Sequence, residues 1–497
     1  MEAPTERYDV IVVGAGFGGL GAALTAAERG ARVLLLESLN YPGGCASTFQ
    51  RSGYAFEAGA TLFSGFGPGQ LFHDWMERHG MSVSIDFMDP VVHFRTPSWS
   101  LDVSRNRTDF FRSLASLPDT PMESIVQLER AQRQVADVLW ELLDNPDELP
   151  PMKPSALLAH LRRSPRYLML LPYLGRSLGA CLQAWGVPET SGLRTYLNAL
   201  CQITIQCSAE EAESTFALGT MDYYFRGTGH VRGGIGRLAW AFVETIQGLG
   251  QDVLLAHRVK CIRREEGEWV VEARGRRFRG AKLLANLLPA DLERLRNDVP
   301  DTRMEALQQR VEAGWGAAML YWVVEPPPSS SEGGPRHYEL VQDEALPLTD
   351  GNHLFVSISG EEDEGRAPEG LRTVTTSTHV HMARLQEEGG RYVAEVQERM
   401  RQGLGALLPD WWQRRRFEMT ASPRTFQRFT GRSQGFVGGI PRRRSLQHYS
   451  GVFPRPVEDG LYLVGDSVFP GQSTLATAIG GRRTARAALS KAWLFSR

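Results

Sequence analysis

The sequence predicts an α/β protein with two domains, one of which is assembled from three stretches that lie far apart in the chain. With 497 residues, the chain is too long for a single compact core. A glycine-rich turn follows an apolar strand near the amino terminus, a Gly-Gly turn precedes a helix in the middle, and a strand ending in Gly-Asp stands near the carboxyl terminus. Each of these patterns is typical of an α/β sheet.

Composition excludes several classes of partner. Hydrophobic residues make up 42% and charged residues 23%, as in ordinary soluble proteins, and a net charge of −2 gives no basis for nucleic-acid binding. No signal peptide is evident, and no stretch approaches the ~18 apolar residues of a membrane span. The five cysteines lack metal-ligand spacing, which predicts free thiols in a cytoplasmic protein without a metal site: Cys45, Cys181, Cys201, Cys207 and Cys261.

The segment "YDVIVVGAGFGGLGAALTAAERGARVLLLES" predicts a dinucleotide site. Tyr8 to Val13 is a continuous apolar run, as in a buried parallel strand, and a second strand over Arg32 to Leu36 ends at Glu37 and Ser38. Between them stands a G-x-G-x-x-G turn: Gly14, Ala15, Gly16, Phe17, Gly18 and Gly19. Its glycines form the tight turn, let a pyrophosphate approach, and let the helix pack closely. Glu37 suits the ribose hydroxyls of an adenosine, so the pattern predicts a Rossmann fold.

The next stretch, "NYPGGCASTFQRSGYAFEAGATLFSG", indicates whether the expected dinucleotide is NAD or FAD. It carries a second Gly-Gly turn like that of the glutathione-reductase-like FAD superfamily, in which the chain folds over the ribityl and phosphate region. This resemblance implies that FAD is the dinucleotide and adds further expected contacts: Gly43, Gly44, Cys45, Ala46, Ala60 and Thr61. For Cys45 we favour a packing role over a reactive thiol.

Residues 71–220 are predicted to be mostly helical. Within them "HLRRSPRYLMLLPYLGRSLGACL" allows two interpretations. One is a core helix pair broken at Pro172. The other is a helix that lies in a membrane surface, which would place the protein at the inner face of the membrane, with arginines at the lipid headgroups: Arg162, Arg163, Arg166 and Arg176.

The middle of the chain predicts a second dinucleotide-domain segment and then a second sheet. A helix from Leu238, a strand over Val253 to Leu255 and a meander ending in Leu283 to Leu287 resemble the superfamily's second segment, in which Val259 would contact the adenine side. Sheet-like runs follow, with "EPPPSSSEGGP" and "GEEDEGRAPEG" as solvated loops. His379 and His381 are expected to be packed or hydrogen-bonded rather than metal ligands.

The stretch "LYLVGDSVFPGQSTLATAIG" predicts that the chain returns to the first sheet. Leu461 to Val464 form the strand, and Gly465 and Asp466 follow it, with the carboxylate placed to accept ribityl hydroxyls. A helix then starts at Gln472, Ser473 and Thr474, and its free amides suit the flavin N1 and C2 carbonyl, where reduced flavin carries negative charge. Arg482 and Arg483, further along this helix, are expected to face solvent.

Three segments together resemble one group of flavoproteins, the phytoene desaturases, carotenoid isomerases and retinol saturases: "GGCASTFQRSGYAFEAGA", "SPRTFQRFTGRSQGFVGG" and "GDSVFPGQSTLATAIGG". The resemblance implies a glutathione-reductase-like Rossmann FAD domain and an α+β substrate domain. We expect the FAD domain to comprise 1–70, 228–300 and 455–497, and the substrate domain to comprise 71–227 and 301–454, with its helical part facing a membrane in the second interpretation above.

The same resemblance implies noncovalent FAD and an apolar polyene or isoprenoid substrate. Isomerisation, desaturation and saturation stay open, because Phe469-Pro470-Gly471-Gln472 resembles the isomerase form while Ser473, Thr474 and Glu57 depart from common patterns. Electrons would pass to or from a quinone, oxygen or a redox partner. No catalytic residue is assigned, and the candidates on the substrate side are Arg424, Thr425, Tyr449 and Phe469.

Two other functions compete with this one. A flavin amine oxidase of related architecture would need an aromatic cage beside the flavin, and the carboxyl-terminal motif does not resemble that group. A non-redox protein that binds prenyl groups, like the Rab escort and GDP-dissociation-inhibitor proteins, would not need the intact glycine turn with Glu37 or the complete carboxyl-terminal flavin segment.

Overall fold

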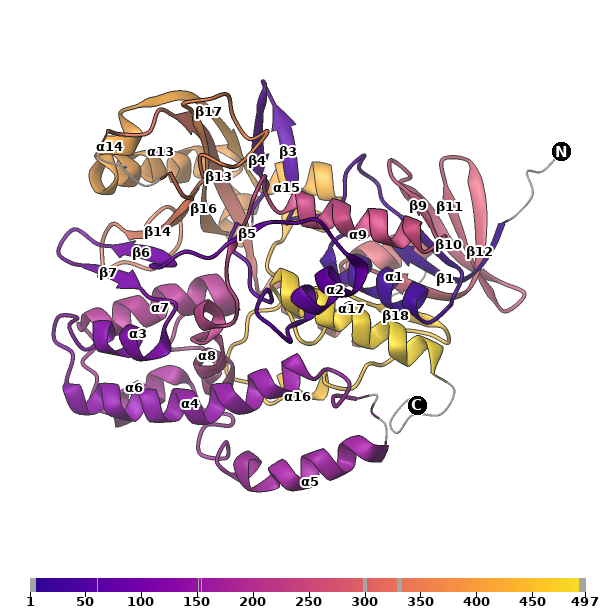
Figure 1. The fold of residues 1–497 in the computed structure, drawn as a ribbon, viewed down its shortest axis with the longest axis horizontal. Helices are drawn as coiled ribbons and strands as arrows, with labels where there is room; N and C mark the ends of the chain where they lie inside the picture. The colour runs from indigo at the N-terminus through magenta and orange to yellow at the C-terminus, as the bar shows by residue number, and fades with distance from the viewer. Residues whose placement is uncertain are drawn as a thin grey trace.

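Two seven-stranded sheets organise the part of the chain that the structure describes (Figure 1). The computed structural model describes residues 6–59, 61–150, 152, 154–297, 302–328 and 333–490. Helices cover the first sheet and one face of the second, and a further helical layer lies below the second sheet in Figure 1. This arrangement, with a largely parallel first sheet, confirms the predicted α/β fold class.

The first sheet carries the amino-terminal glycine turn. Its strands run in the order β10 (Val259–Glu265), β11 (Glu268–Ala273), β12 (Arg276–Ala285), β1 (Glu6–Val13), β2 (Val33–Leu36) and β9 (Asp252–Leu254), and β18 (Leu461–Leu463) also pairs with β12. The first half of β12 pairs antiparallel with β11, and its second half pairs parallel with β18. Because β1, β2, β9, β18 and the end of β12 are parallel, their carboxyl ends meet at one edge.

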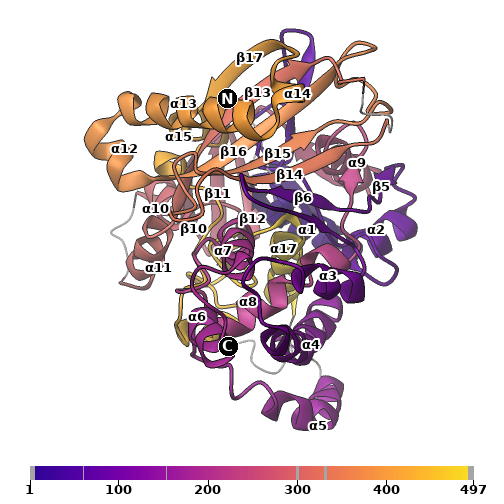
Figure 2. The ribbon, with the colours of Figure 1, turned by 90° about the vertical axis from the view of Figure 1, so that its left-hand side faces the viewer.

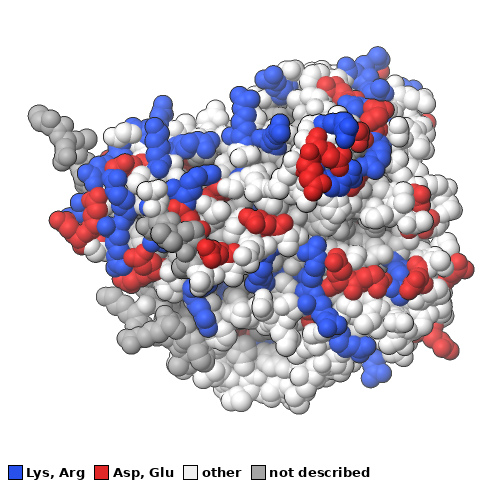
Figure 3. Space-filling view, turned by 180° about the vertical axis from the view of Figure 1, so that it is seen from behind, with Lys and Arg blue, Asp and Glu red and all other residues white. Residues whose placement is uncertain are grey.

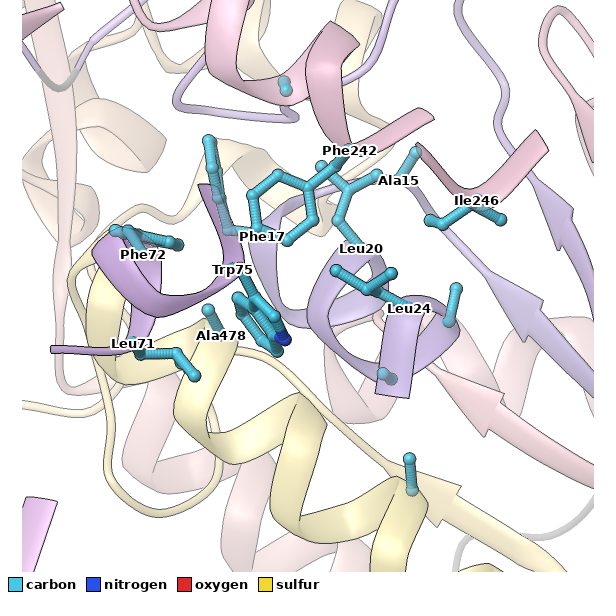
Figure 4. Close-up of a cluster of buried hydrophobic side chains, with 14 of the residues drawn as sticks. Ala15, Phe17, Leu20, Leu24, Leu71, Phe72, Trp75, Phe242, Ile246 and Ala478 are labelled. Carbon is cyan, nitrogen blue, oxygen red and sulfur yellow. The ribbon is translucent and has the colours of Figure 1, made fainter. Parts of the chain in front are cut away.

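Small residues bring two distant helices together on this sheet. The helices that cover it are α1 (Phe17–Glu28), α2 (Leu71–His79), α9 (Gly236–Gly248) and α17 (Thr474–Leu489). A Cβ added to Gly481 would lie 2.0 Å from the Gly18 carbonyl oxygen, so α17 contacts α1 almost backbone to backbone. Phe17, Trp75 and Phe242 pack beside this contact, and the ring centres of Trp75 and Phe242 are 5.3 Å apart (Figure 4). The buried apolar area holds the two chain ends in one unit.

The second sheet is antiparallel except for one pairing. Its order is β17 (Arg415–Ala421), β13 (Trp315–Val324), β16 (Arg372–His381), β15 (His353–Ile358), β14 (Arg336–Val341), β6 (Val92–Arg95) and β7 (Ser100–Val103). Its core packs against the helical segments α12 (Met382–Glu388), α13 (Gly390–Leu407) and α14 (Pro409–Trp412). The expectation of a mostly helical 71–220 was incomplete, because β6 and β7 pair with each other in this range and β6 also pairs with the distant β14.

A helical layer lies next to both sheets (Figure 2). It consists of α3 (Arg107–Leu114), α4 (Met122–Asp144), α5 (Pro154–Leu168), α6 (Leu178–Ala184), α7 (Gly192–Ile205), α8 (Ser214–Thr220) and the 3-10 turn η1 (Tyr223–Phe225). The remaining elements are β3 (Thr48–Arg51), β4 (Tyr54–Glu57), β5 (Ile85–Asp86), β8 (His230–Val231), α10 (Pro289–Arg296), α11 (Thr302–Glu312), α15 (Pro423–Thr430), η2 (Ser433–Gly435) and α16 (Gln447–Ser450).

Helix α5 lies at the outer edge of this layer (Figures 1 and 2). Only Ala156 is buried among its described residues, and Leu161 is 68% exposed. The interpretation of this segment as a core helix pair was therefore wrong for α5, whose leucines follow a helical period but face outward. It holds for the start of α6, where Leu178 and Leu182 are buried. Among the described residues, no helix is both long and apolar enough to cross a membrane.

Candidate functional site

The turn between β1 and α1 opens the site at the carboxyl edge of the first sheet. Gly14 has φ 95°, which favours glycine. A Cβ on Gly19 would lie 1.9 Å from the Gly14 carbonyl oxygen, so only glycine lets α1 start this close to β1. The helix begins at Phe17 without a side-chain cap, which leaves its first amides for an anionic ligand.

Glu37 is fixed at the end of β2. Its side chain is 7% exposed, and its carboxylate accepts hydrogen bonds from the Ala15 amide at 2.7 Å and the Leu39 amide at 2.8 Å. The Ser38 hydroxyl donates to it at 3.0 Å. These donors orient the carboxylate beside the glycine turn. Oε1 accepts from both Ser38 and Leu39, whereas Oε2 accepts from Ala15 alone and keeps a lone pair for a ribose hydroxyl.

The second Gly-Gly turn lies against the first one. The Gly43 amide donates to the Ala15 carbonyl at 2.8 Å, and a Cβ on Gly44 would lie 3.4 Å from the Gly16 Cα. Burial raises the pKa of the Cys45 thiol, which fits a packing residue better than a nucleophile. Ala60, which sequence reasoning also placed here, lies outside the described residues.

Asn286 completes this edge, and sequence reasoning missed it. It follows β12 directly, and its side-chain nitrogen donates to the Gly14 carbonyl at 3.4 Å. A Cβ on Gly16 would lie 2.7 Å from that nitrogen, and a Cβ on Gly18 would lie 2.9 Å from the amide oxygen. The signal available in the sequence was the predicted buried strand over Leu283 to Leu287. A strand that pairs parallel with β1 ends at the same edge of the sheet, so a residue at its end lies beside the glycine turn.

The carboxyl-terminal segment brings a carboxylate to the same edge. Asp466 follows β18 and is paired with Arg432, whose Nη2 lies 2.8 Å from Oδ2 and whose Nη1 lies 3.3 Å from Oδ1. Arg432 also donates from Nε to the Phe436 carbonyl at 2.7 Å, which fixes its direction. Sequence reasoning predicted Asp466 but not this partner, which follows α15 in another part of the chain.

Helix α17 starts where the cofactor contact was predicted. Ser473 caps it, with φ 90° and its hydroxyl accepting from the Ala476 amide at 3.0 Å. The Gln472 side chain donates to the Ile203 carbonyl at 3.0 Å, which ties this turn to the end of α7. Thr474 is 5% exposed, and its hydroxyl has no hydrogen-bond partner among the described residues.

One cavity of about 890 Å³ joins these groups. The predicted cofactor residues that line it are Gly14, Gly16, Phe17, Gly18, Glu37, Ser38, Gly43, Gly44, Cys45, Ala46, Thr61, Val259, Gly465, Asp466, Gln472, Ser473 and Thr474. Ala15 and Gly19 stand just behind the wall, as their contacts with Glu37 and Gly14 show. Segments from both chain ends and the middle therefore share one site.

The far end of the cavity is apolar and reaches α5. Its wall there includes Leu139, Leu143, Leu149, Met152, Leu170 and Leu174. Of the predicted substrate-side residues, Tyr449 and Phe469 line the cavity. Arg424 is exposed, Thr425 caps α15, and neither lines the cavity, so the structure does not bring them to the site.

Two other sequence expectations are corrected. Arg483 is 2% exposed rather than solvent-facing, because its guanidinium donates to the Pro150 carbonyl and lies 4.9 Å from the centre of the Phe469 ring. Arg482 is partly exposed and pairs with Asp147 at 3.2 Å. The acidic loop is also not simply solvated, since its Asp363 is buried and lies 2.8 Å from the His230 ring nitrogen.

The two histidines on β16 have neighbours that explain them without a metal. The His379 Nε2 lies 2.9 Å from the Gln206 side-chain nitrogen, and burial lowers the pKa of His379 to about 3. The His381 ring lies 4.6 Å from the Trp315 ring, centre to centre. Within the described ranges, no group of three or more metal-ligating side chains occurs.

The cavity fits a flavin dinucleotide, since its glycine turns leave room that a Cβ would fill and its helix ends offer free amides. Comparison with known proteins supports the same cofactor. The family model for flavin-containing amine oxidoreductases matches residues 17–489. The chloroplastic prolycopene isomerase of Arabidopsis thaliana is 26% identical over 497 residues, covering 95% of this chain and 81% of the relative. The human all-trans-retinol 13,14-reductase is 50% identical over 54 residues, 11% of this chain and 9% of the relative.

A solved oxidoreductase from Methanosarcina mazei shares the fold. It matches with a TM-score of 0.63 and 18% identity, and the match covers 95% of this chain and 98% of that one. The sequence match over nearly the whole chain, the fold and the geometry of the cavity agree. This chain belongs to the flavin-containing amine oxidoreductase family, and FAD is its cofactor.

Proposed function

We propose that this flavoenzyme converts a long apolar polyene of the isoprenoid class, and that carotenoid cis–trans isomerisation is the reaction. The observation that carries the proposal is the shape of the cavity, which continues from the dinucleotide turn to the leucines beneath α5. The long alignments with prolycopene isomerases support the same substrate class. Desaturation, in which the substrate loses two hydrogens, is the competing reaction.

The charges along the cavity favour an apolar substrate. The carboxylates among the described lining residues are Glu37, Asp291 and Asp466. Glu37 and Asp466 stand at the dinucleotide edge, and Asp291 accepts from the Ser433 amide at 3.0 Å, directly beside Arg432. The apolar end therefore offers a protonated amine no counter-charge, and burying such a cation there would be costly.

The chain's own residues would bind, orient and dehydrate the substrate. The leucines of α4 and of the segments before and after α5 hold an extended hydrocarbon and exclude water. Phe469 and Tyr449 limit the position of the hydrocarbon on the side of the cofactor. The FAD, when bound, supplies the redox chemistry at its N5 atom. Phe469 is itself held in place, because Arg483 lies over its ring and α17 packs behind it.

The mass of the product decides the reaction. FAD-loaded protein should convert a poly-cis carotene to a product of unchanged mass and changed retention time. Loss of two hydrogens would identify a desaturase, and gain of two a saturase; adding a quinone or oxygen then identifies the electron acceptor. Hydrogen peroxide from an amine panel, with no polyene converted, would overturn the proposal in favour of an amine oxidase. A colourless protein that cannot be loaded with FAD would favour the prenyl-binding alternative.

We also propose that α5 contacts a lipid surface. Outward-facing apolar side chains gather there: Leu157, Leu158, Leu161, Leu168, Met169 and Leu171. Seen from behind, the lower end of the molecule, where α5 lies in Figure 1, is largely uncharged (Figure 3). Arg163 and Arg166 are paired with Glu141, so the contact depends more on apolar burial than on anionic lipid. Since Leu170 of the following turn lines the cavity, an apolar substrate would enter here from the lipid.

A further inference from the structure

A buried arginine, Arg442, lines the cavity near the start of α17, and its surroundings differ from those of the partly buried Arg432. Arg442 is 8% exposed, and its Nη2 donates to the Pro470 carbonyl at 2.5 Å. Its guanidinium lies 5.1 Å from the centre of the Phe216 ring, and its Nη1 lies 3.1 Å from the His448 Nδ1. These contacts hold the guanidinium against the Pro470 carbonyl, in the segment that leads to Gln472 and Ser473.

No carboxylate balances this charge within the described part of the chain. The nearby buried Glu213 is directed elsewhere, since its Oε2 accepts from the Thr215 amide at 3.0 Å and its Oε1 from the Gly175 amide at 3.1 Å. Another cation, Arg310, shares His448 with Arg442. Burial and Arg310 lower the pKa of Arg442 to about 10, so it stays protonated at neutral pH. Burying an unpaired cation is costly, which argues that an anion belongs beside it.

Helix α17 points its positive end into the same part of the cavity. It has 16 residues, and its first amides have no acceptor within the helix. The Thr474 hydroxyl is buried without a partner among the described residues and lines the cavity. A helix terminus, an unpartnered hydroxyl and a guanidinium without a carboxylate partner therefore line the stretch of the cavity from Pro470 to Thr474.

We propose that Arg442 is a cofactor-binding residue that holds reduced FAD in its anionic form, with the negative charge at N1 and the C2 carbonyl. Reduction then takes up two electrons and one proton, because N1 stays deprotonated beside the guanidinium. The inference rests on FAD as the cofactor and not on the polyene reaction. A failure of the polyene assay would therefore leave it standing.

The proton count of flavin reduction tests this in the wild-type holoprotein. Stepwise reduction with dithionite at several pH values between about 6 and 8 gives the midpoint potential as a function of pH. We expect a slope that corresponds to one proton for two electrons throughout this range. A slope that corresponds to two protons would overturn the proposal without any variant.

Variants then assign the effect to Arg442. Arg442→Met removes the charge that stabilises the reduced anion, which should lower the midpoint potential. The same loss should favour protonation of the reduced flavin by roughly tenfold or more and move the slope toward two protons. Arg442→Lys keeps the charge and should retain most of the wild-type behaviour. Arg310→Met is the matched control, because Arg310 shares His448 but does not line the cavity, and it should change both quantities much less than Arg442→Met does. Equal potentials and slopes in Arg442→Met and wild type would contradict the assignment.

Discussion

The two ends of the cavity are built in opposite ways. At the dinucleotide end, the polar side chains are held by several partners: Glu37 by the Ala15 and Leu39 amides, and Asp466 by Arg432. At the α5 end, the wall is mostly leucines, joined by His160 and Tyr167 of α5, and the leucines of α5 itself face outward. One end thus specifies its ligand by directed hydrogen bonds and close backbone contacts. The other selects by size and apolar character and tolerates change more readily.

The largest effect should come from breaking the backbone contact at the dinucleotide end. Gly19→Ala places a methyl group 1.9 Å from the Gly14 carbonyl oxygen, so α1 must move away from the turn. We expect FAD affinity to fall roughly a hundredfold or more, measured by fluorescence titration of apoprotein. Gly248→Ala is the control, because a Cβ there meets no atom within 4 Å. Equal FAD affinity in both variants would show that the close packing is not needed.

A smaller effect should follow from removing one charge of the Arg432–Asp466 pair. Asp466→Asn leaves Arg432 without its carboxylate partner in the cavity wall, and it weakens the acceptor for ribityl hydroxyls. We expect roughly tenfold weaker FAD binding and a loss of about 1–3 kcal/mol in unfolding free energy.

The double variant Arg432→Gln/Asp466→Asn separates these two effects. It should regain much of the unfolding free energy, because no unpaired charge remains, while FAD binding stays weak. Denaturant unfolding of the apoprotein and FAD titration measure the two quantities separately. Recovery of both would mean that the pair serves only the fold.

At the apolar end, filling the cavity should slow the reaction without affecting the cofactor. Leu170→Trp adds volume where Leu170 lines the wall, so polyene conversion should fall several-fold or more, with unchanged FAD affinity. Leu171→Trp is the matched control, since Leu171 is 59% exposed and does not line the cavity. The comparison fails if the two tryptophan variants convert substrate equally fast.

The smallest effect on the protein itself is expected on the outer face of α5. Leu168→Ser/Leu171→Ser should change the free energy of unfolding by less than about 0.5 kcal/mol, because both side chains are already in water. The same variant should float less with neutral phosphatidylcholine liposomes than wild type. Equal flotation of the two proteins, or none by either, would contradict the lipid contact.

The same contrast explains which parts of the molecule could be predicted. The glycine turns, Glu37, Asp466 and the start of α17 are short motifs whose residue types have one main use, and the structure brings them to one cavity. The outward direction of the α5 leucines was not evident, because a helical apolar period does not show which side the rest of the protein covers.

The sequence by itself determined the α/β class, the order of the glycine-rich segments and the FAD character of the site, because backbone conformation and close approach are properties of local residues. Only the tertiary structure decided which side chains meet there. Asn286 reaches the glycine turn because β12 lies beside β1, and Arg432 and Arg442 reach the cavity from the chain between α15 and α16. The charge balance of the site, with one arginine paired and the other not, is a property of packing and not of any motif.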